Sequence, residues 1–168
     1  MTKPKNNQLP LFGYGLYFVA ASMIITILTL FYFNDIKIFQ IGIINNIFIK
    51  RFFSFISIIL ILLGVFLWGY AVFPSNGIKY KIEHGELATE GAYSISRNPI
   101  YLSHFIFQLG LQMRTYNLFV VIVTIIIYIS LDSLVKNTEE KWCLEKFGKQ
   151  YEEYCKKVNR LIPWFKKK

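Results

Sequence analysis

The sequence has few charged residues, and acidic residues are scarcer than basic ones. Only 17% of its 168 residues are charged, and 10 Asp and Glu stand against 19 Lys and Arg, which gives a formal net charge of +9. Hydrophobic residues make up 54% of the chain. This composition excludes an ordinary small soluble domain and indicates one membrane-embedded domain covering residues 1–168.

Residues that bind metals are equally rare, with two cysteines and two histidines. Cys143 and Cys155 lie twelve residues apart with no histidine near them in sequence, a spacing that fits neither a zinc site nor a disulfide framework. We therefore expect no metal. The sequence also lacks the GxGxxG, Walker, HExxH and GxSxG motifs. Its basic residues are not interleaved with exposed stacking aromatics, so we expect no nucleic acid partner.

Long apolar segments without charge are present instead. Two of them reach the roughly 20 residues that a helix needs to cross about 30 Å of hydrocarbon. A third apolar region is interrupted at Arg114, which predicts a tight helical hairpin. Because lipid offers no hydrogen bonds to the backbone, these segments must be helices. We expect an all-α polytopic membrane protein with about four spans, residues 11–33, 52–73, 98–113 and 117–137.

Four spans place both termini on one side of the membrane. That side then carries 15 of the 19 Lys and Arg residues, which predicts that the termini are cytoplasmic. Residues 34–51 are expected at the opposite interface. The amphipathic pattern from Asp132 predicts that the last span continues into the cytosol as one helix, and Gly148 is expected to end it before a second short helix.

Four features could carry chemistry. Pro99 suits the first position of a helix whose free N–H groups would favour an anion, and Arg97 beside it adds a bidentate donor. Glu139 and Glu140 are adjacent, so on a helix they point about 100° apart and only one can face a site. His104 within the third span is either functional or a neutral histidine bonded to a neighbouring helix. The GYG at residues 13–15 predicts close helix packing.

Two longer motifs add a family resemblance to these single residues. They are LATEGAYSISRNPIYLS at residues 87–103 and EEKWCLEKFGKQYEEYCKKVNRLIP at residues 139–163. Together they resemble the isoprenylcysteine carboxyl methyltransferase family and its phospholipid methyltransferase relatives. The resemblance implies an integral membrane enzyme that transfers a methyl group from S-adenosyl-L-methionine to a lipophilic acceptor entering from the bilayer. It places the cofactor in a cytosol-facing region formed by residues 85–163.

The resemblance also implies roles for individual residues. Those assigned to the cofactor are Gly85, Glu86, Leu87, Ala88, Tyr93, Asn98, Pro99, Ile100, Tyr101 and Glu139. Those assigned to catalysis are Arg97, Glu140, Arg160 and His104. A carboxylate acceptor needs no catalytic base, whereas an amine must lose a proton, for which Glu140 or His104 would be candidates.

The acceptor is left open between an isoprenylcysteine-like carboxylate and a phospholipid or other lipid-like substrate. An arginine that the prenylcysteine enzymes link to their substrate is Val135 here. Two alternatives to a methyltransferase also stay open: a membrane sterol-reductase-like enzyme that uses NADPH, and a non-catalytic membrane protein on the same scaffold. Thr138, Glu139 and Glu140 stand where the reductases carry arginines, and these carboxylates would repel a 2′-phosphate.

Overall fold

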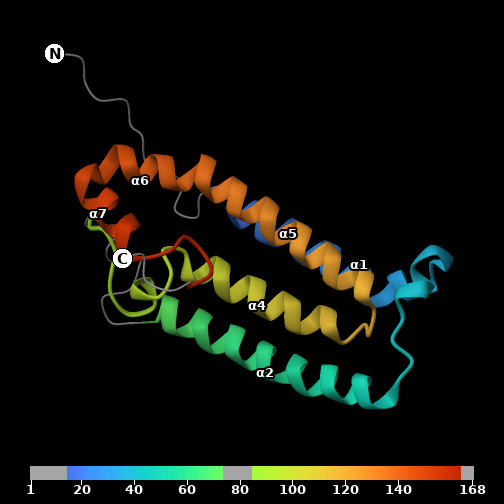
Figure 1. The fold of residues 1–168 in the computed structure, drawn as a ribbon. Coiled ribbons are helices and arrows are strands. Elements are labelled where there is room, and N and C mark those ends of the chain that lie inside the picture. Colours follow the sequence, from blue (N-terminus) through green and yellow to red (C-terminus); the bar gives the residue numbers. More distant parts are fainter. Residues whose placement is uncertain (1–14, 74–84, 164–168) are drawn as a thin grey trace.

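The computed structural model describes residues 15–73 and 85–163, and these residues contain helices and no strand, as predicted. The α-helices are α1 (Gly15–Tyr32), α2 (Ile47–Val72), α4 (Pro99–Met113), α5 (Leu118–Asn137), α6 (Glu139–Phe147) and α7 (Lys149–Lys157). The short 3-10 helices are η1 (Phe33–Asp35), η2 (Lys37–Gly42) and η3 (Gly91–Ser94). Figure 1 shows that α1 begins, α2 ends and α4 begins at the end of the bundle that carries α6 and α7. We call this the site end.

The predicted membrane helices form with small shifts at their ends. Three helical segments are long and apolar enough to cross a membrane, Tyr17–Asp35, Ile47–Val72 and Leu118–Phe147. Helix α2 begins five residues before the predicted span, because the Asn46 side chain accepts hydrogen bonds from the amides of Phe48 and Ile49. Helix α4 has the predicted bounds to within a residue but is only 15 residues long, so its crossing stays a prediction. Residues 11–14 of the first predicted span lie outside the described residues.

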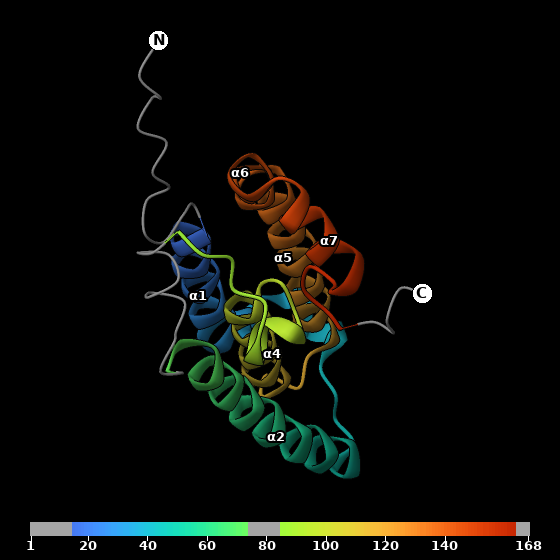
Figure 2. The same cartoon turned by 90° about the vertical axis from the view of Figure 1, so that its left-hand side faces the viewer.

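Helix α4 lies at the centre of the bundle and contacts α1, α2 and α5 (Figure 2). Its closest neighbour is α2, and two glycines make that approach possible. A Cβ atom built on Gly110 would lie 2.9 Å from the backbone nitrogen of Ile61, and one built on Gly64 would lie 2.8 Å from that of Phe107. The Ser57 hydroxyl donates to the Gly110 carbonyl over 2.7 Å. Small residues therefore allow α2 and α4 to approach closely, as is common for helix pairs in membranes.

The bundle has polar residues inside and apolar residues outside. Large hydrophobic side chains such as Phe31, Phe55, Phe66 and Ile126 are exposed on α1, α2 and α5. Much of the interior between the helices is polar, with these buried side chains: Ser22, Thr26, Thr29, Ser57, Gln108, Gln112 and Thr124. This distribution suits a lipid solvent, in which polar groups must find their partners within the protein.

The cytosolic helix that was predicted to continue the last span is divided in two. Thr138 interrupts it with φ −118° and ψ −78°, so α5 ends at Asn137 and α6 begins at Glu139. The Thr138 hydroxyl donates to the Leu134 carbonyl over 2.7 Å, a local bond that competes with regular helix geometry. Gly148, with φ 50°, ends α6 as predicted and lets the chain turn into α7. As a result, α6 and α7 fold back over the site end.

The α4–α5 hairpin is also as predicted, and residues 33–46 cover its turn. Tyr116 adopts φ 52° within the turn. The Asn117 amide donates to Asn34 Oδ1 at 2.9 Å and to the Phe39 carbonyl at 3.0 Å, which holds η1 and η2 against the hairpin. The predicted site residues lie at the opposite end of the bundle and are therefore distant from residues 33–46.

Candidate active site

Two segments that are about 60 residues apart in sequence join at the site end. The backbone N–H groups of Arg97 and Asn98 donate to the carbonyls of Asn159 and Arg160 over 2.9 and 3.1 Å. The Ser96 hydroxyl donates to the same Arg160 carbonyl over 3.0 Å. Residues 158–163, which we call the C-terminal strap, therefore lie along the start of α4.

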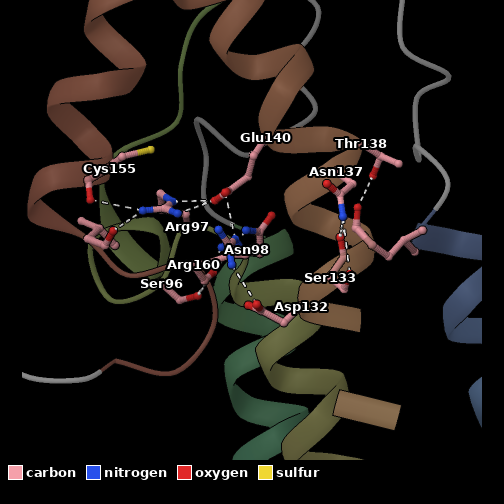
Figure 3. A network of polar contacts seen from close by, with 12 residues as sticks. Ser96, Arg97, Asn98, Asp132, Ser133, Asn137, Thr138, Glu140, Cys155 and Arg160 are labelled. Atoms are coloured by element: carbon pink, nitrogen blue, oxygen red, sulfur yellow. Dashed lines mark hydrogen bonds and ion pairs between the residues drawn. The ribbon is translucent and has the colours of Figure 1, made fainter. Parts of the chain in front are cut away.

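Glu140 stands between two arginines in this region (Figure 3). Its Oε1 accepts from Nε of Arg97 at 2.9 Å and forms a short ion pair with Nη2 of the same residue. Its Oε2 accepts from Nε of Arg160 at 2.8 Å, and Nη1 of Arg160 donates to Asp132 Oδ2 at 2.8 Å. The side chains of Arg97 and Glu140 are only 9% and 12% exposed. Two cations and two carboxylates balance, so this network carries no net charge. We call it the clamp.

Arg97 has a second function within the clamp. Its Nη1 donates to the carbonyls of Cys155 and Val158 at 3.2 and 2.7 Å, in the last turn of α7 and at its end. A cation that binds the free carbonyls of a helix C-terminus is favourable for both hydrogen bonding and the helix dipole. The Arg97 guanidinium thus connects the start of α4 with α6 and α7.

A groove lies beside the clamp, between the face of α5 and the C-terminal strap. It has a volume of about 340 Å³, and its lining residues are Arg97, Tyr128, Ile129, Asp132, Asn159, Arg160, Leu161 and Ile162. Charged groups line one part and apolar groups another. Such a surface is suited to an amphiphilic molecule.

Glu139 points away from the clamp, toward α1 and α4. Its Oε1 accepts from the Tyr101 hydroxyl at 2.6 Å and from the Gly15 amide at 3.3 Å. Tyr93 of η3 is close to this carboxylate as well. Burial, and after it the charge of Glu139, raise the pKa of Tyr93, so its hydroxyl stays a protonated donor at neutral pH. The structure therefore brings three of the predicted cofactor residues together, Tyr93, Tyr101 and Glu139.

The other predicted cofactor residues surround the same end. Pro99 begins α4 as expected, and no side chain caps that helix; the Asn98 side-chain amide donates to the Arg160 carbonyl. Gly85 adopts φ 69°, and a Cβ on it would lie 3.9 Å from Nζ of Lys146 on α6. Gly85, the first of the four predicted cofactor residues Gly85, Glu86, Leu87 and Ala88, therefore lies near the end of the Lys146 side chain. Ile100 packs against the core cluster of Leu67, Ala71, Ala92 and Leu102.

His104, assigned to catalysis, lies further along α4 than these residues. A hydrogen bond of 2.8 Å joins its Nε2 to the hydroxyl of Ser22 on α1. Of the two alternatives raised by the sequence, this contact matches a histidine bonded to a neighbouring helix. The catalytic role of His104 stays a prediction.

Several residues of the site were not found from the sequence. Asp132 had been used only as the start of an amphipathic pattern, and its partner Arg160 is 28 residues away. The GYG motif had predicted close packing, and Gly15 does pack closely, but its contact with Glu139 is 124 residues distant in sequence. Val135, which stands in place of the substrate-linked arginine, is 1% exposed in an apolar cluster with Leu131 and Leu161.

Comparison with known proteins identifies methyltransferases that are similar to this chain. The family model for phospholipid methyltransferases matches residues 44–150. A protein-S-isoprenylcysteine O-methyltransferase of Schizosaccharomyces pombe is 36% identical over 77 residues, which is 46% of this chain and 33% of that protein. The enzyme of the same name from Saccharomyces cerevisiae is 29% identical over 140 residues, 80% of this chain and 56% of that protein. An Arabidopsis thaliana relative, protein-S-isoprenylcysteine O-methyltransferase B, is 32% identical over 82 residues, 49% of this chain and 42% of that protein.

The chain thus spans from about a third to just over half of the length of these relatives. No solved structure matches it. The family match covers α2, η3, α4, α5 and α6, and so includes both Arg97 and the Glu139–Glu140 pair. The chain belongs to the phospholipid methyltransferase family.

Proposed function

We propose that this chain binds S-adenosyl-L-methionine at the site end and uses it to methylate a lipophilic acceptor that arrives from the bilayer. The observation that carries the proposal is the environment of Glu139. Its carboxylate is partly buried, receives hydrogen bonds from neutral donors on one oxygen, and lies beside two tyrosines at the uncapped start of α4. Among the described residues, 15–73 and 85–163, no arginine or lysine forms an ion pair with it, in contrast to Glu140.

The residues present fit the proposed cofactor chemically. An ammonium group or ribose hydroxyls suit the carboxylate of Glu139. The first turn of α4, after Asn98 and Pro99, offers free amide groups to a carboxylate. Tyr93 and Tyr101 provide aromatic rings near which a cation such as a sulfonium is favourable. Gly85, Glu86, Leu87, Ala88 and Ile100 would complete the walls. Bound there, the cofactor would supply an electrophilic methyl group.

The protein's part in such a transfer is alignment of donor and acceptor and exclusion of water. We assign Arg97, Glu140 and Arg160 to this task, because they hold α6, α7 and the C-terminal strap against the start of α4. Both oxygens of Glu140 already accept from arginines, which makes Glu140 a poor general base. His104 would then be the candidate base for an amine acceptor.

The acceptor is proposed to be lipophilic because the exposed faces of α1, α2 and α5 are apolar and the groove beside the clamp opens next to Ile129. The relatives are named protein-S-isoprenylcysteine O-methyltransferases, which points to a lipidated acceptor. The buried apolar setting of Val135 offers a carboxylate no cation at that position. The distribution of Lys and Arg supports an orientation in which the site end faces the cytoplasm.

Cofactor binding can be tested by calorimetric titration of the protein in detergent or nanodiscs. We expect heat with S-adenosyl-L-methionine and none with NADPH. Glu139→Ala and Tyr101→Ala should each weaken binding at least about tenfold, since each removes a charged hydrogen bond worth roughly 1.5–3 kcal/mol. Arg114→Ala is the matched control, because Arg114 lies at the far end of α4 and is exposed. Binding of NADPH, or equal losses in all three variants, would contradict the proposal.

The acceptor requires a second experiment. Membranes containing the protein would be incubated with methyl-labelled cofactor, and the label followed into lipid extracts, proteins and small molecules. Label in the organic extract indicates a lipid acceptor, and label in protein that is released by base indicates a carboxyl methyl ester. Label that does not exceed the level with Glu139→Ala membranes would argue against transfer by this chain.

A further inference from the structure

Helix α1 takes part in the Glu139 site although it lies outside the residues matched by the family model. Its first residue, Gly15, is buried, and the Gly15 amide donates to Glu139 Oε1 at 3.3 Å. A Cβ atom on Gly15 would lie 1.6 Å from the Tyr101 hydroxyl oxygen and 2.2 Å from the ring carbon that bears it. No side chain larger than hydrogen fits at residue 15 unless Tyr101 moves.

The two hydrogen bonds to Glu139 converge on the same oxygen. Tyr101 and Gly15 both donate to Oε1, and in the described part of the chain these are the hydrogen bonds that Glu139 accepts. Two donors on one carboxylate oxygen fix the rotation of the group and leave Oε2 for a ligand. The donors come from different helices, so the direction of Oε2 depends on how α1 lies against α4.

A series of polar contacts fixes the position of α1 along α4. Ser22 bonds His104 at 2.8 Å, Gln108 donates to Thr26 at 3.0 Å, and Thr29 donates to Gln112 at 2.8 Å. The three α1 residues recur at helical spacing on one face, and so do their α4 partners. Thr26, Gln108 and Gln112 are at most 1% exposed. A shift of α1 by one turn would break all three contacts, which we call the ladder.

We infer that α1 is a positioning element of the cofactor site: the ladder holds its register on α4, and Gly15 together with Tyr101 orients Glu139 toward the bound donor. Gly15 and Ser22 are positioning residues, because they act through Glu139 and Tyr101. The inference rests on the proposed function for the identity of the ligand, and on the contacts alone for the orientation of Glu139. The inference also gives His104 a structural role, because its contact with Ser22 is part of the ladder.

The test compares Gly15→Ala and Tyr101→Phe, each alone and combined with Glu139→Ala, by titration with S-adenosyl-L-methionine. Each single variant should weaken binding about tenfold, because Tyr101→Phe removes a hydrogen bond to a charged group and Gly15→Ala displaces the Tyr101 hydroxyl that makes it. In the Glu139→Ala background each should change affinity by less than about twofold, because the carboxylate through which it acts is absent. Gly69→Ala on α2 is the matched control, since its Cβ would make an ordinary 3.7 Å contact with the Phe73 ring.

A second measurement does not depend on the cofactor. Hydrophobic carbodiimides label protonated carboxyl groups in apolar surroundings, and hydrogen bonds to the ionised form disfavour protonation. Labelling of Glu139, followed by mass spectrometry, should rise several-fold in Gly15→Ala and Tyr101→Phe and less in Ser22→Ala, but not in Gly69→Ala.

The outcomes separate the two ideas. If the wild type binds no S-adenosyl-L-methionine but labelling rises as expected, the proposed function fails and the orientation of Glu139 by α1 stands. If Gly15→Ala binds and labels like the wild type, the inference is overturned. An equal loss of affinity in the presence and absence of Glu139→Ala would overturn it as well, because the effect would then be one of general folding. If Gly15→Ala does not fold, Tyr101→Phe and Ser22→Ala decide between these outcomes.

Discussion

Glu139 and Glu140 are neighbours in sequence, yet they belong to regions of opposite character. Glu140 faces the C-terminal strap, where both of its oxygens accept hydrogen bonds from arginines. Glu139 faces α1 and α4, where neutral donors converge on one oxygen. A fully paired carboxylate stabilises structure, whereas a partly paired one can bind a ligand. The comparison teaches that the same residue type, one position apart on a helix, is paired with arginines in one region and with neutral donors in the other.

The largest expected effect comes from breaking the clamp with Arg97→Ala. The change leaves Glu140 with one partner fewer in a setting where its side chain is 12% exposed, and it removes the bonds to the α7 carbonyls. We expect a loss of roughly 3 kcal/mol or more in the free energy of unfolding. Thermal unfolding in nanodiscs measures it. The control Lys156→Ala removes an ion pair whose side chains are 69% and 62% exposed, and should change stability by less than about 1 kcal/mol. Equal effects would refute the structural importance of the clamp.

The comparison is sharpest in a pair of isosteric changes, Glu139→Gln and Glu140→Gln. The first should weaken cofactor binding about tenfold to a hundredfold and alter stability by less than about 1 kcal/mol, because an amide can still accept from Tyr101 and Gly15. The second should lower the melting temperature clearly, since two arginines lose their counter-charge. Measuring affinity and melting temperature for both variants shows whether Glu139→Gln mainly lowers affinity and Glu140→Gln mainly lowers the melting temperature. Parallel losses in both quantities would mean that the two carboxylates share one role.

The smallest effect is expected at the edge of the clamp, with Asp132→Asn. The side chains of Asp132 and Arg160 are 36% and 21% exposed, so solvent screens their attraction. We expect a loss of about 0.5–1 kcal/mol that shrinks as salt is raised from low to molar concentration. Melting curves at the two salt concentrations measure it. A loss as large as that of Arg97→Ala, or one insensitive to salt, would place Asp132 at the centre of the clamp.

The membrane helices could be predicted because their signal is local. Uncharged runs define α1, α2 and α5 within a few residues, and Pro99 and Gly148 mark helix ends through their own backbone chemistry. The angle between adjacent residues on a helix also predicted that only one of the two glutamates faces a site. The break at Thr138 was not predicted, because it depends on a single side-chain bond to the Leu134 carbonyl.

The long-range contacts of the site could not be read from the sequence. Periodicity gives the polar face of α1 but not its partner, since Ser22 and His104 are 82 residues apart. The motif in residues 139–163 placed Glu140 and Arg160 near the cofactor region, but nothing in it indicated that they bind each other. Gly15 lies near neither motif, and the space that it leaves for Tyr101 exists only in the folded bundle.

The ladder between α1 and α4 has a consequence for the order in which the chain is assembled. Each hydroxyl of α1 in the ladder also has a carbonyl acceptor within its own helix: Val19 for Ser22, Ser22 for Thr26 and Thr26 for Thr29. Helix α1 can therefore enter a bilayer alone, whereas the amides of Gln108 and Gln112 depend on hydroxyls of α1. At about 5–20 residues per second, a ribosome needs roughly 4–16 s to synthesise the 82 residues between Ser22 and His104. We therefore expect α1 to insert first and α4 to become stably buried only after it has bound α1.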